Sequence, residues 1–318
     1  MHWLAKAALQ RAVSALPRAE SANYLLQRHV SRTLPASESG FRRKFRRALV
    51  HVEAYARHGP ERPLADAVFY EVGAGWDLAV PLSFWALGVD RQVLVDLRPH
   101  VRAELVAATL RRLRELAPEL ETDAGRPLRR PGRHDGALDR LAAEFGIQYL
   151  APRDACRTGL PSESVDFVTS TSTLEHVPVE ELPALLAECR RLLAAGGAMS
   201  SAIDLRDHFS YFDRSLSPYN FLRYSDSTWR LLNSELGFQN RLRRPDYLRL
   251  FEAAGFEIVA ERSRTPRPKL AKTLRRIEPA PRFRGYRPED LAVTKLDLVV
   301  RPAAGLPDAA QELGDLGG

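Results

Sequence analysis

The sequence predicts an α/β fold in which a mostly parallel sheet is covered by helices on both faces. Two observations indicate this. Between residues 67 and 205, short apolar runs alternate with amphipathic segments of helical period, the order expected when helices join parallel strands. The runs also contain few polar residues, as expected of strands buried on both faces. Such sheets bind ligands at the carboxyl ends of their strands, so the residues that follow each strand are candidates for function.

Residues 1–60 predict a helical N-terminal extension. Phe41, Phe45 and Leu49 recur at helical spacing until Gly59-Pro60 ends the pattern. The expected strands then cover residues 67–75, 91–99, 147–155, 164–172 and 198–205. The expected helices cover residues 78–88, 101–116, 138–146 and 182–197, the last of them stopped by two glycines at its end.

The remaining segments are expected to be additions around this core. Residues 117–136 are polar and glycine-rich, and they predict a long insertion to which no role is assigned. Residues 209–244 are dense in aromatic residues, Asn and Arg, which suits a lid over an acceptor. A last helix and two closing strands are expected over 243–261 and 291–302. The main domain is therefore expected to span residues 61–302, and the tail 303–318 is expected to be disordered.

Charge and cysteine content narrow the classes of function. The 318 residues carry 47 basic and 40 acidic side chains, a net charge of +7. Only five of the basic residues are lysines, so the arginine excess reflects a coding bias as readily as a nucleic-acid surface. The basic residues also lack the interleaved aromatics of a single-strand binder, which argues against nucleic acid as a partner. Two cysteines form neither a disulfide framework nor a zinc spacing, and they fit a reducing, cytoplasmic location.

No apolar segment reaches the ~18 residues that a transmembrane helix requires. The first twenty residues carry basic side chains within their apolar part, unlike a signal peptide. They predict a short amphipathic helix, which is expected to pack on its own domain and leaves peripheral contact with a membrane surface open.

Polar residues and glycines follow the first three expected strands. Glu71, Gly73 and Gly75 lie at the first turn, and Asp96 ends the second strand 21 residues beyond Gly75. Glycines allow a ligand to approach the backbone closely, and a carboxylate at the second position can bind both hydroxyls of a ribose. A dinucleotide site would need a third glycine where this chain has Leu78. The acidic Glu71 would also repel a pyrophosphate, so the pattern favours a ribose-containing ligand that carries a cation.

Together with Asp154-Ala155 after the third strand and the segments SVDFVTSTSTLEHV and LLAECRRLLAAGG, this pattern resembles the class I S-adenosylmethionine-dependent methyltransferases. The resemblance is to the branch with an L-E-H segment after strand four, and it covers about residues 66–208. It implies a Rossmann-like, seven-stranded, mostly parallel sheet with a lid insertion after strand five. It also implies S-adenosyl-L-methionine as cofactor.

Carried over residue by residue, the resemblance implies a role for each strand end. Glu71 would lie near the methionine ammonium group, with the backbone of Gly73 and Gly75 passing the methionine and ribose. Asp96 would bind the ribose diol. The adenine ring would contact the Asp154 side chain and the Ala155 amide, and Ser170 and Thr171 would line the reacting end. Trp76, after the second glycine, would either cover the ligand or pack beneath it.

Methyl transfer from a sulfonium needs mainly alignment and exclusion of water, and it needs a base only where the acceptor loses a proton. Two histidines are candidates for that base, His208 after strand five and His176 in the L-E-H segment. Asp204, Asp207 and His208 were also considered as metal ligands, but no partner after strand four completes that set, so no metal is expected.

The expected function is methyl transfer to a small-molecule or glycan-type acceptor, at oxygen. Two alternatives remain open: a nucleic-acid or protein methyltransferase, and a non-catalytic protein that binds S-adenosylmethionine. The acceptor's identity and the oligomeric state do not follow from the sequence.

Overall fold

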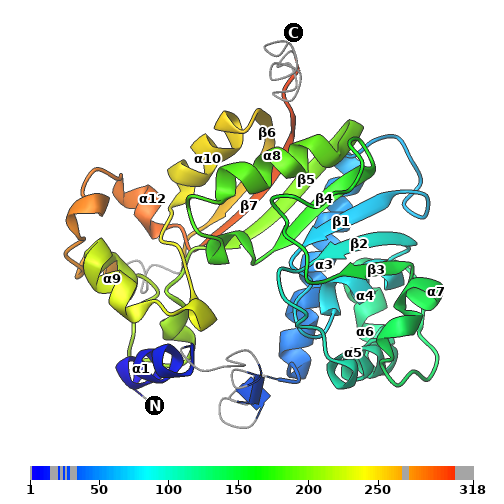
Figure 1. The fold of residues 1–318 in the computed structure, drawn as a ribbon, viewed down its shortest axis with the longest axis horizontal. Helices are drawn as coiled ribbons and strands as arrows, with labels where there is room; N and C mark the ends of the chain where they lie inside the picture. Colours follow the sequence, from blue (N-terminus) through cyan, green and yellow to red (C-terminus); the bar gives the residue numbers. More distant parts are fainter. Residues whose placement is uncertain are drawn as a thin grey trace.

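The computed structural model describes residues 2–14, 21, 24–25, 27–28, 34–266 and 272–304. A seven-stranded sheet in the order β3-β2-β1-β4-β5-β7-β6 forms its centre (Figure 1). The pairs among the first five strands are parallel, whereas β7 is antiparallel to both β5 and β6. The predicted fold class is therefore confirmed. The strands are β1 (Val68–Val72), β2 (Arg91–Val95), β3 (Ile147–Leu150), β4 (Val165–Thr171), β5 (Leu193–Asp204), β6 (Phe256–Arg264) and β7 (Lys295–Pro302).

Helices cover both faces of the sheet because neighbouring strand residues point to opposite sides. Phe69 of β1 belongs to a core shared with α3 (Glu38–His58), α4 (Ala79–Ala86) and α5 (Ala103–Glu115). The next residue, Tyr70, belongs to the opposite core with α8 (Leu182–Leu192) and α10 (Arg244–Ala253). The other helices are α1 (Trp3–Ser14), α6 (Ala117–Ala124), α7 (Leu141–Phe145), α9 (Asp226–Leu232) and α12 (Pro288–Ala292). Short 3₁₀ turns are η2 (Leu138–Arg140), η3 (Leu174–His176), η4 (His208–Tyr211), η5 (Asn220–Arg223), η6 (Glu235–Gly237) and η7 (Pro281–Phe283).

A third hydrophobic core lies beside the sheet, in what we call the side lobe: α1, residues 208–237 and residues 273–292. Figure 1 shows α1, α9 and α12 together at one side of the sheet. Tyr219, Phe221 and Trp229 are buried there against Trp3 of α1 and Phe283. Most aromatic side chains of the expected lid are thus core residues of the lobe.

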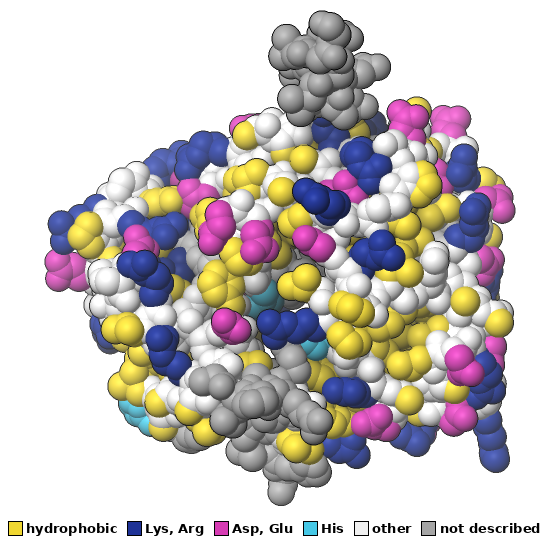
Figure 2. Space-filling view, in the orientation of Figure 1, with side chains coloured by type: hydrophobic (Ala, Val, Ile, Leu, Met, Phe, Trp, Pro, Cys, Tyr) yellow, Lys and Arg dark blue, Asp and Glu magenta, His cyan; other side chains and the backbone are white. Residues whose placement is uncertain are grey.

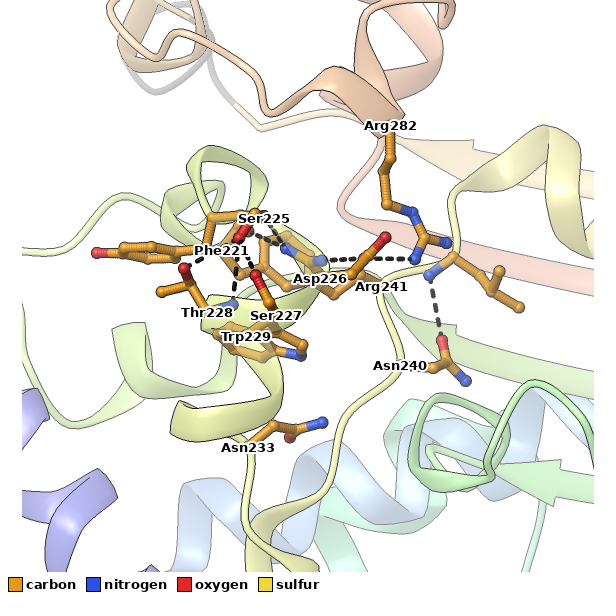
Figure 3. A network of polar contacts seen from close by, with 12 residues as sticks. Phe221, Ser225, Asp226, Ser227, Thr228, Trp229, Asn233, Asn240, Arg241 and Arg282 are labelled. Carbon is orange, nitrogen blue, oxygen red and sulfur yellow. Dashed lines mark hydrogen bonds and ion pairs between the residues drawn. The ribbon is translucent and has the colours of Figure 1, made fainter.

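Arg241 and Arg243 attach the lobe to the sheet. Arg241 donates a hydrogen bond to the carbonyl of Phe221 (2.9 Å) and pairs with Asp226 (2.5 Å), which also pairs with Arg282 (3.0 Å) (Figure 3). Arg243 is fully buried and donates to the carbonyls of Leu205 (2.7 Å) and Leu291 (2.9 Å), and also to that of Val293. These contacts make residues 209–244 a packed part of the fold.

The predicted end of the helix at 182–197 is wrong. The helix α8 ends at Leu192, and Leu193 takes an extended conformation and pairs with Val165 of β4. An irregularity in β4 between Val165 and Phe167 allows β5 to begin before the two glycines. Sheet pairing with a distant strand therefore overrides the helical pattern of the leucines.

The 117–136 insertion is only partly a loop, because its first residues form α6. This helix packs under α3, where Asp123 pairs with Arg46 (3.2 Å). The boundary expected near residue 60 stays a prediction, although α3 shares its core with the sheet. The tail from residue 305 on lies outside the described residues. Within the described ranges, no helix combines the length and apolar character needed to cross a membrane.

Candidate functional site

The turn after β1 depends on its two glycines. Gly73 has a φ of 83° and Gly75 a φ of 70°, in the left-handed region that other residues rarely adopt. A Cβ atom at Gly73 would lie 2.7 Å from Oγ1 of Thr173, whereas one at Gly75 would meet nothing within 4 Å. Gly73 therefore fits against the protein, and Gly75 leaves space on its exposed side.

Glu71 is the buried carboxylate beside this turn. It is 2% exposed and accepts a hydrogen bond from the Thr169 hydroxyl. Burial raises its pKa to about 7, although hydrogen bonds from Thr169 and Thr171 oppose the shift. No basic side chain of the described residues pairs with Glu71, so a ligand cation would relieve the cost of its charge.

The carboxylate of Asp96 ends β2 and faces the same turn. One oxygen accepts from the backbone N–H of Ala74 (3.0 Å), and the other accepts from the hydroxyl of Tyr149 (3.0 Å). Burial raises the pKa of Asp96 to about 6. An ionised carboxylate offers about four acceptor positions, so two remain for a ribose diol.

Asp154 and Ala155 follow β3. Asp154 is exposed and caps its own turn by accepting from the backbone N–H of Cys156 (2.8 Å), and Ala155 is half-buried. Their backbone connects to the β2 end because the N–H of Arg153 donates to the carbonyl of Asp96 (2.9 Å). Asp96, Asp154 and Ala155 thus lie at successive strand ends along one edge of the sheet.

A cavity of about 1350 Å³ opens beside the β1 turn. Of the predicted site residues it contains Glu71, Gly73, Gly75 and Thr171. Asp96, Asp154 and Ala155 lie outside its lining, and of these Asp96 contacts the turn through the backbone N–H of Ala74. Ser170 also lies outside, because alternate residues of β4 point to opposite faces: Thr171 points toward His51 of α3 (3.2 Å), whereas Ser170 is buried on the other side.

The aromatic Trp76 packs on neighbouring rings. Its ring stacks on Tyr24, with centroids 5.6 Å apart, and packs in a tilted arrangement against His100 at 4.9 Å. The next residue, Asp77, is 4% exposed and pairs with Lys44 of α3 through both oxygens, at 2.7 and 2.8 Å. Nothing in the sequence pairs Lys44 with Asp77, although Lys44 lies in the charge run FRRKFRR.

The cavity has a basic wall that we define as Arg47, Arg206, Arg264 and Lys295. Arg47 and Arg264 approach Asp297 at 2.5 and 3.6 Å, and Arg206 pairs with Asp204 at 2.7 Å. Within the described part of the chain the side chain of Lys295 has no hydrogen bond or ion pair, whereas its backbone belongs to the sheet. Burial lowers the pKa of Lys295, and Arg47 adds to the shift. Figure 2 shows a hollow near the middle of the molecule with basic and histidine side chains at its edge.

This wall comes from the reversed last strand. Because β7 is antiparallel to β5, the backbone of Lys295 lies opposite that of Asp204 at the carboxyl end of β5. The backbone of Arg264, at the end of β6, lies opposite Lys295 on its other side. Among all residues that line the cavity, eight are Lys or Arg and five are Asp or Glu. The cavity therefore favours a ligand with a net negative charge.

The two predicted histidines lie together behind this cavity. Their ring centroids are 4.9 Å apart, and neither residue belongs to its lining. Burial lowers the pKa of His208 to about 3. The groups packed around the ring of His176 desolvate it and lower its pKa too, although the residue as a whole is exposed at the surface. An ordinary histidine base would be protonated below about pH 6.5, and the transfer rate would then fall. Such a fall is therefore not expected from His208. Asp207 points away from the histidines, since it accepts from Phe209 N–H (2.8 Å) and the Asn220 amide (3.0 Å).

Residues 134–200, about a fifth of the chain, match the family model described as "Methyltransferase domain". No curated protein matches the chain. Among solved structures, it is similar to 1,6-didemethyltoxoflavin-N1-methyltransferase from Burkholderia thailandensis, with 16% identity, 91% of each chain covered and a TM-score of 0.47. It is also similar to geranyl diphosphate C-methyltransferase from Streptomyces coelicolor A3(2), with 13% identity, 92% of this chain and 88% of that chain covered, and a TM-score of 0.47. Similarity at this level says nothing about the acceptor.

The seven-stranded, mostly parallel sheet agrees with the fold that the resemblance to class I S-adenosylmethionine-dependent methyltransferases implies, and residues 134–200 within it match a methyltransferase domain. The match supports a methyltransferase, and S-adenosyl-L-methionine is the cofactor that the resemblance implies.

Proposed function

We propose that the enzyme transfers a methyl group from S-adenosylmethionine to a hydroxyl oxygen of a small polar acceptor that carries a phosphate or carboxylate group. One observation carries this proposal. A single cavity joins the glycine turn of β1 to the basic wall, so the cofactor's reacting end and an anionic acceptor would share one space. A glycan-type acceptor with such a group fits equally.

At the cofactor end, Glu71 would bind the methionine ammonium group, and Gly75 would let the backbone approach the ligand. Lys44 lines the same cavity, and it would bind the methionine carboxylate while remaining next to its partner Asp77. Asp96 would bind the ribose diol, with its remaining acceptor positions directed by Ala74 N–H and Tyr149. Asp154, Ala155 and Thr171 keep the roles that the family resemblance implies for them, whereas Ser170 is buried on the other side of the sheet and does not line the reacting end.

At the acceptor end, the basic wall would bind the anionic group and thereby orient the hydroxyl toward the sulfonium. Alignment of this kind accounts for a large part of the catalysis of a bimolecular transfer. Lys295 supports this role best, because it is half-buried without an ion pair among the described residues and an acceptor anion would offset its desolvation.

The proton of the hydroxyl would leave toward Asp204, which lies in the cavity wall and accepts hydrogen bonds from Tyr211 and Arg206. His208 and His176 remain the other candidates for general base. Their lowered pKa values and their position behind the lining make them weaker bases for an acceptor in the cavity.

The test is an assay with methyl-labelled S-adenosylmethionine and pairs of hydroxyl compounds that differ only in a phosphate or carboxylate. We expect methylation of the anionic member alone. Lys295→Gln and Arg206→Gln should raise the KM for that compound by about tenfold or more, with cofactor affinity unchanged. The control Arg249→Gln, on the exposed side of α10, should behave like wild type.

Two results would contradict this proposal. Equal methylation of both members of the pairs would show that the acceptor needs no phosphate or carboxylate group. Cofactor binding without transfer to any compound, nucleic acid or protein would favour the non-catalytic alternative, and transfer to nucleic acid or protein would favour the macromolecular one.

A further inference from the structure

Three metal-ligating side chains meet behind the cavity. Glu175 and His176 belong to η3, in the L-E-H segment after β4, and His208 begins η4 after β5. One ligand atom from each residue lies within 4.8 Å of the other two. The segments come together because β4 and β5 are neighbouring parallel strands, whose carboxyl ends lie side by side.

Two of these ligand groups carry buried atoms without a partner. Glu175 is 1% exposed, and while its Oε1 accepts from the backbone N–H of Asp204 (3.2 Å), its Oε2 has no hydrogen-bond partner. The Nε2 of His208 is also buried without a partner. Unpaired polar atoms in the interior cost free energy, so atoms left in this state at one place call for a missing partner.

The third ligand is held in the form that metal binding requires. The Nδ1 of His176 lies 2.6 Å from the carbonyl of Phe238. A carbonyl only accepts hydrogen bonds, so Nδ1 carries the proton and Nε2 of the neutral ring keeps its lone pair. Metal-bound histidines typically show this arrangement, in which a backbone carbonyl fixes the tautomer.

Gln239 and Asn240, which follow the lobe segment 208–237 in the chain, hold the three ligand residues in place by hydrogen bonds. The Asn240 amide donates to the carbonyls of Leu174 (2.8 Å) and Val177 (3.0 Å), and its backbone N–H donates to the carbonyl of Glu175 (2.8 Å). Gln239 accepts from the backbone N–H of His208 (3.2 Å). A site whose ligands are held by surrounding hydrogen bonds loses little entropy when an ion binds.

We propose that Glu175, His176 and His208 bind a divalent first-row transition-metal ion. Two imidazoles and one carboxylate are a ligand set found in zinc enzymes and in non-haem iron enzymes, and both types leave coordination positions open. Ligand atoms around Zn²⁺ at about 2.1 Å lie roughly 3.4 Å apart, so the side chains close inward on binding.

The site differs from the one considered in the sequence analysis. Asp204 is paired with Arg206, and Asp207 faces the lobe, so neither completes a set with His208. The missing ligands after strand four are Glu175 and His176. The ion would lie next to the cavity wall, since the ring of Tyr211 lies in that wall and 5.5 Å from the ring of His208.

The proposal is tested on the full chain after removal of metal by a chelator and dialysis. Titration with Zn²⁺ alone, in competition with a chromophoric chelator, should give one equivalent per chain. Substitution by Co²⁺ should give the visible absorption of a low-symmetry site. His176→Gln and His208→Gln should each weaken Zn²⁺ binding by at least about 100-fold.

His134→Gln is the matched control, because His134 also lies beside a carboxylate, Glu144, at 3.3 Å but belongs to no cluster of three among the described residues. It should bind Zn²⁺ like wild type. Since His176 is exposed, its variant should fold, and retained affinity for S-adenosylhomocysteine would verify this independently of any methyl acceptor. Absence of saturable Zn²⁺ binding, or equal binding in His176→Gln and wild type, would overturn the proposal.

Discussion

The charge state of Glu71 should control cofactor affinity in the neutral pH range. Its pKa is about 7 in the ligand-free protein, because burial disfavours the ionised form. If only the ionised form binds the cationic methionine group, affinity falls tenfold for each pH unit below that pKa. The dissociation constant should therefore be about tenfold higher at pH 6 than at pH 8.

Glu71→Gln removes the titrating group at nearly constant shape. The variant should bind the cofactor product more weakly at pH 8, by on the order of 2–3 kcal/mol, because a charge-assisted contact is lost. It should also bind with the same affinity at pH 6 and pH 8. Calorimetry with S-adenosylhomocysteine across this range measures both effects, and proton release appears as a dependence on the ionisation enthalpy of the buffer.

Ionisation of Glu71 should strengthen cofactor binding but lower the stability of the ligand-free fold. A carboxyl group whose folded-state pKa is raised from 4.5 to about 7 destabilises the fold increasingly as pH rises through this window. Without cofactor, Glu71→Gln should therefore be more stable than wild type at pH 8, by up to about 3 kcal/mol, and equal to it near pH 4.5. A variant that keeps the wild-type pH slope of affinity would refute the assignment of Glu71.

Three further perturbations test the site and the fold. Asp96→Ala should weaken cofactor binding by about 2–3 kcal/mol, or roughly 30- to 150-fold; unchanged affinity in a folded variant would exclude the ribose contact. Tyr149→Phe removes a hydrogen bond that lowers the pKa of Asp96, so calorimetry should show a loss of affinity that is larger at pH 6 than at pH 8, and no pH dependence of the loss would contradict it. Arg243→Met should cost about 3–5 kcal/mol in urea unfolding, whereas the exposed Arg249→Met should stay within about 0.5 kcal/mol; equal midpoints would show that the buried guanidinium is not an anchor.

Local patterns were enough to predict the sheet and the place of Glu71, Asp96 and Asp154 at the carboxyl ends of its strands. The turn after β1 needs glycines because its backbone is left-handed at residues 73 and 75. Asp96 and Asp154 follow strands that a few residues are enough to recognise. Such signals depend on near neighbours in the chain, so one sequence contains them.

The acceptor side could not be predicted in the same way. Lys295 reaches the cavity only because β7 runs antiparallel beside β5, and Leu193 leaves its helical pattern only because it pairs with Val165. The aromatic residues of 209–244 suggested a binding surface, yet Tyr219 and Phe221 are buried against α1 and residues 273–292. Replacement of residues 209–244 by a short linker would consequently expose a hydrophobic core. The loss of activity in such a variant would therefore not report on acceptor binding alone. Pairings between distant segments decide each of these features.

The order β5-β7-β6 also has a consequence for synthesis on the ribosome. Strand β6 is made before β7, yet β7 is its partner in the sheet, and β7 fills the place between β6 and β5. Until residues 295–302 emerge, β5 keeps an unpaired edge and β6 has no neighbour. A nascent chain halted in this interval could form the β1 turn and the cofactor edge but would lack Lys295 and the closed cavity. The basic wall of the cavity is therefore completed last during translation, and an unpaired edge of this kind is where a chaperone or another chain would bind.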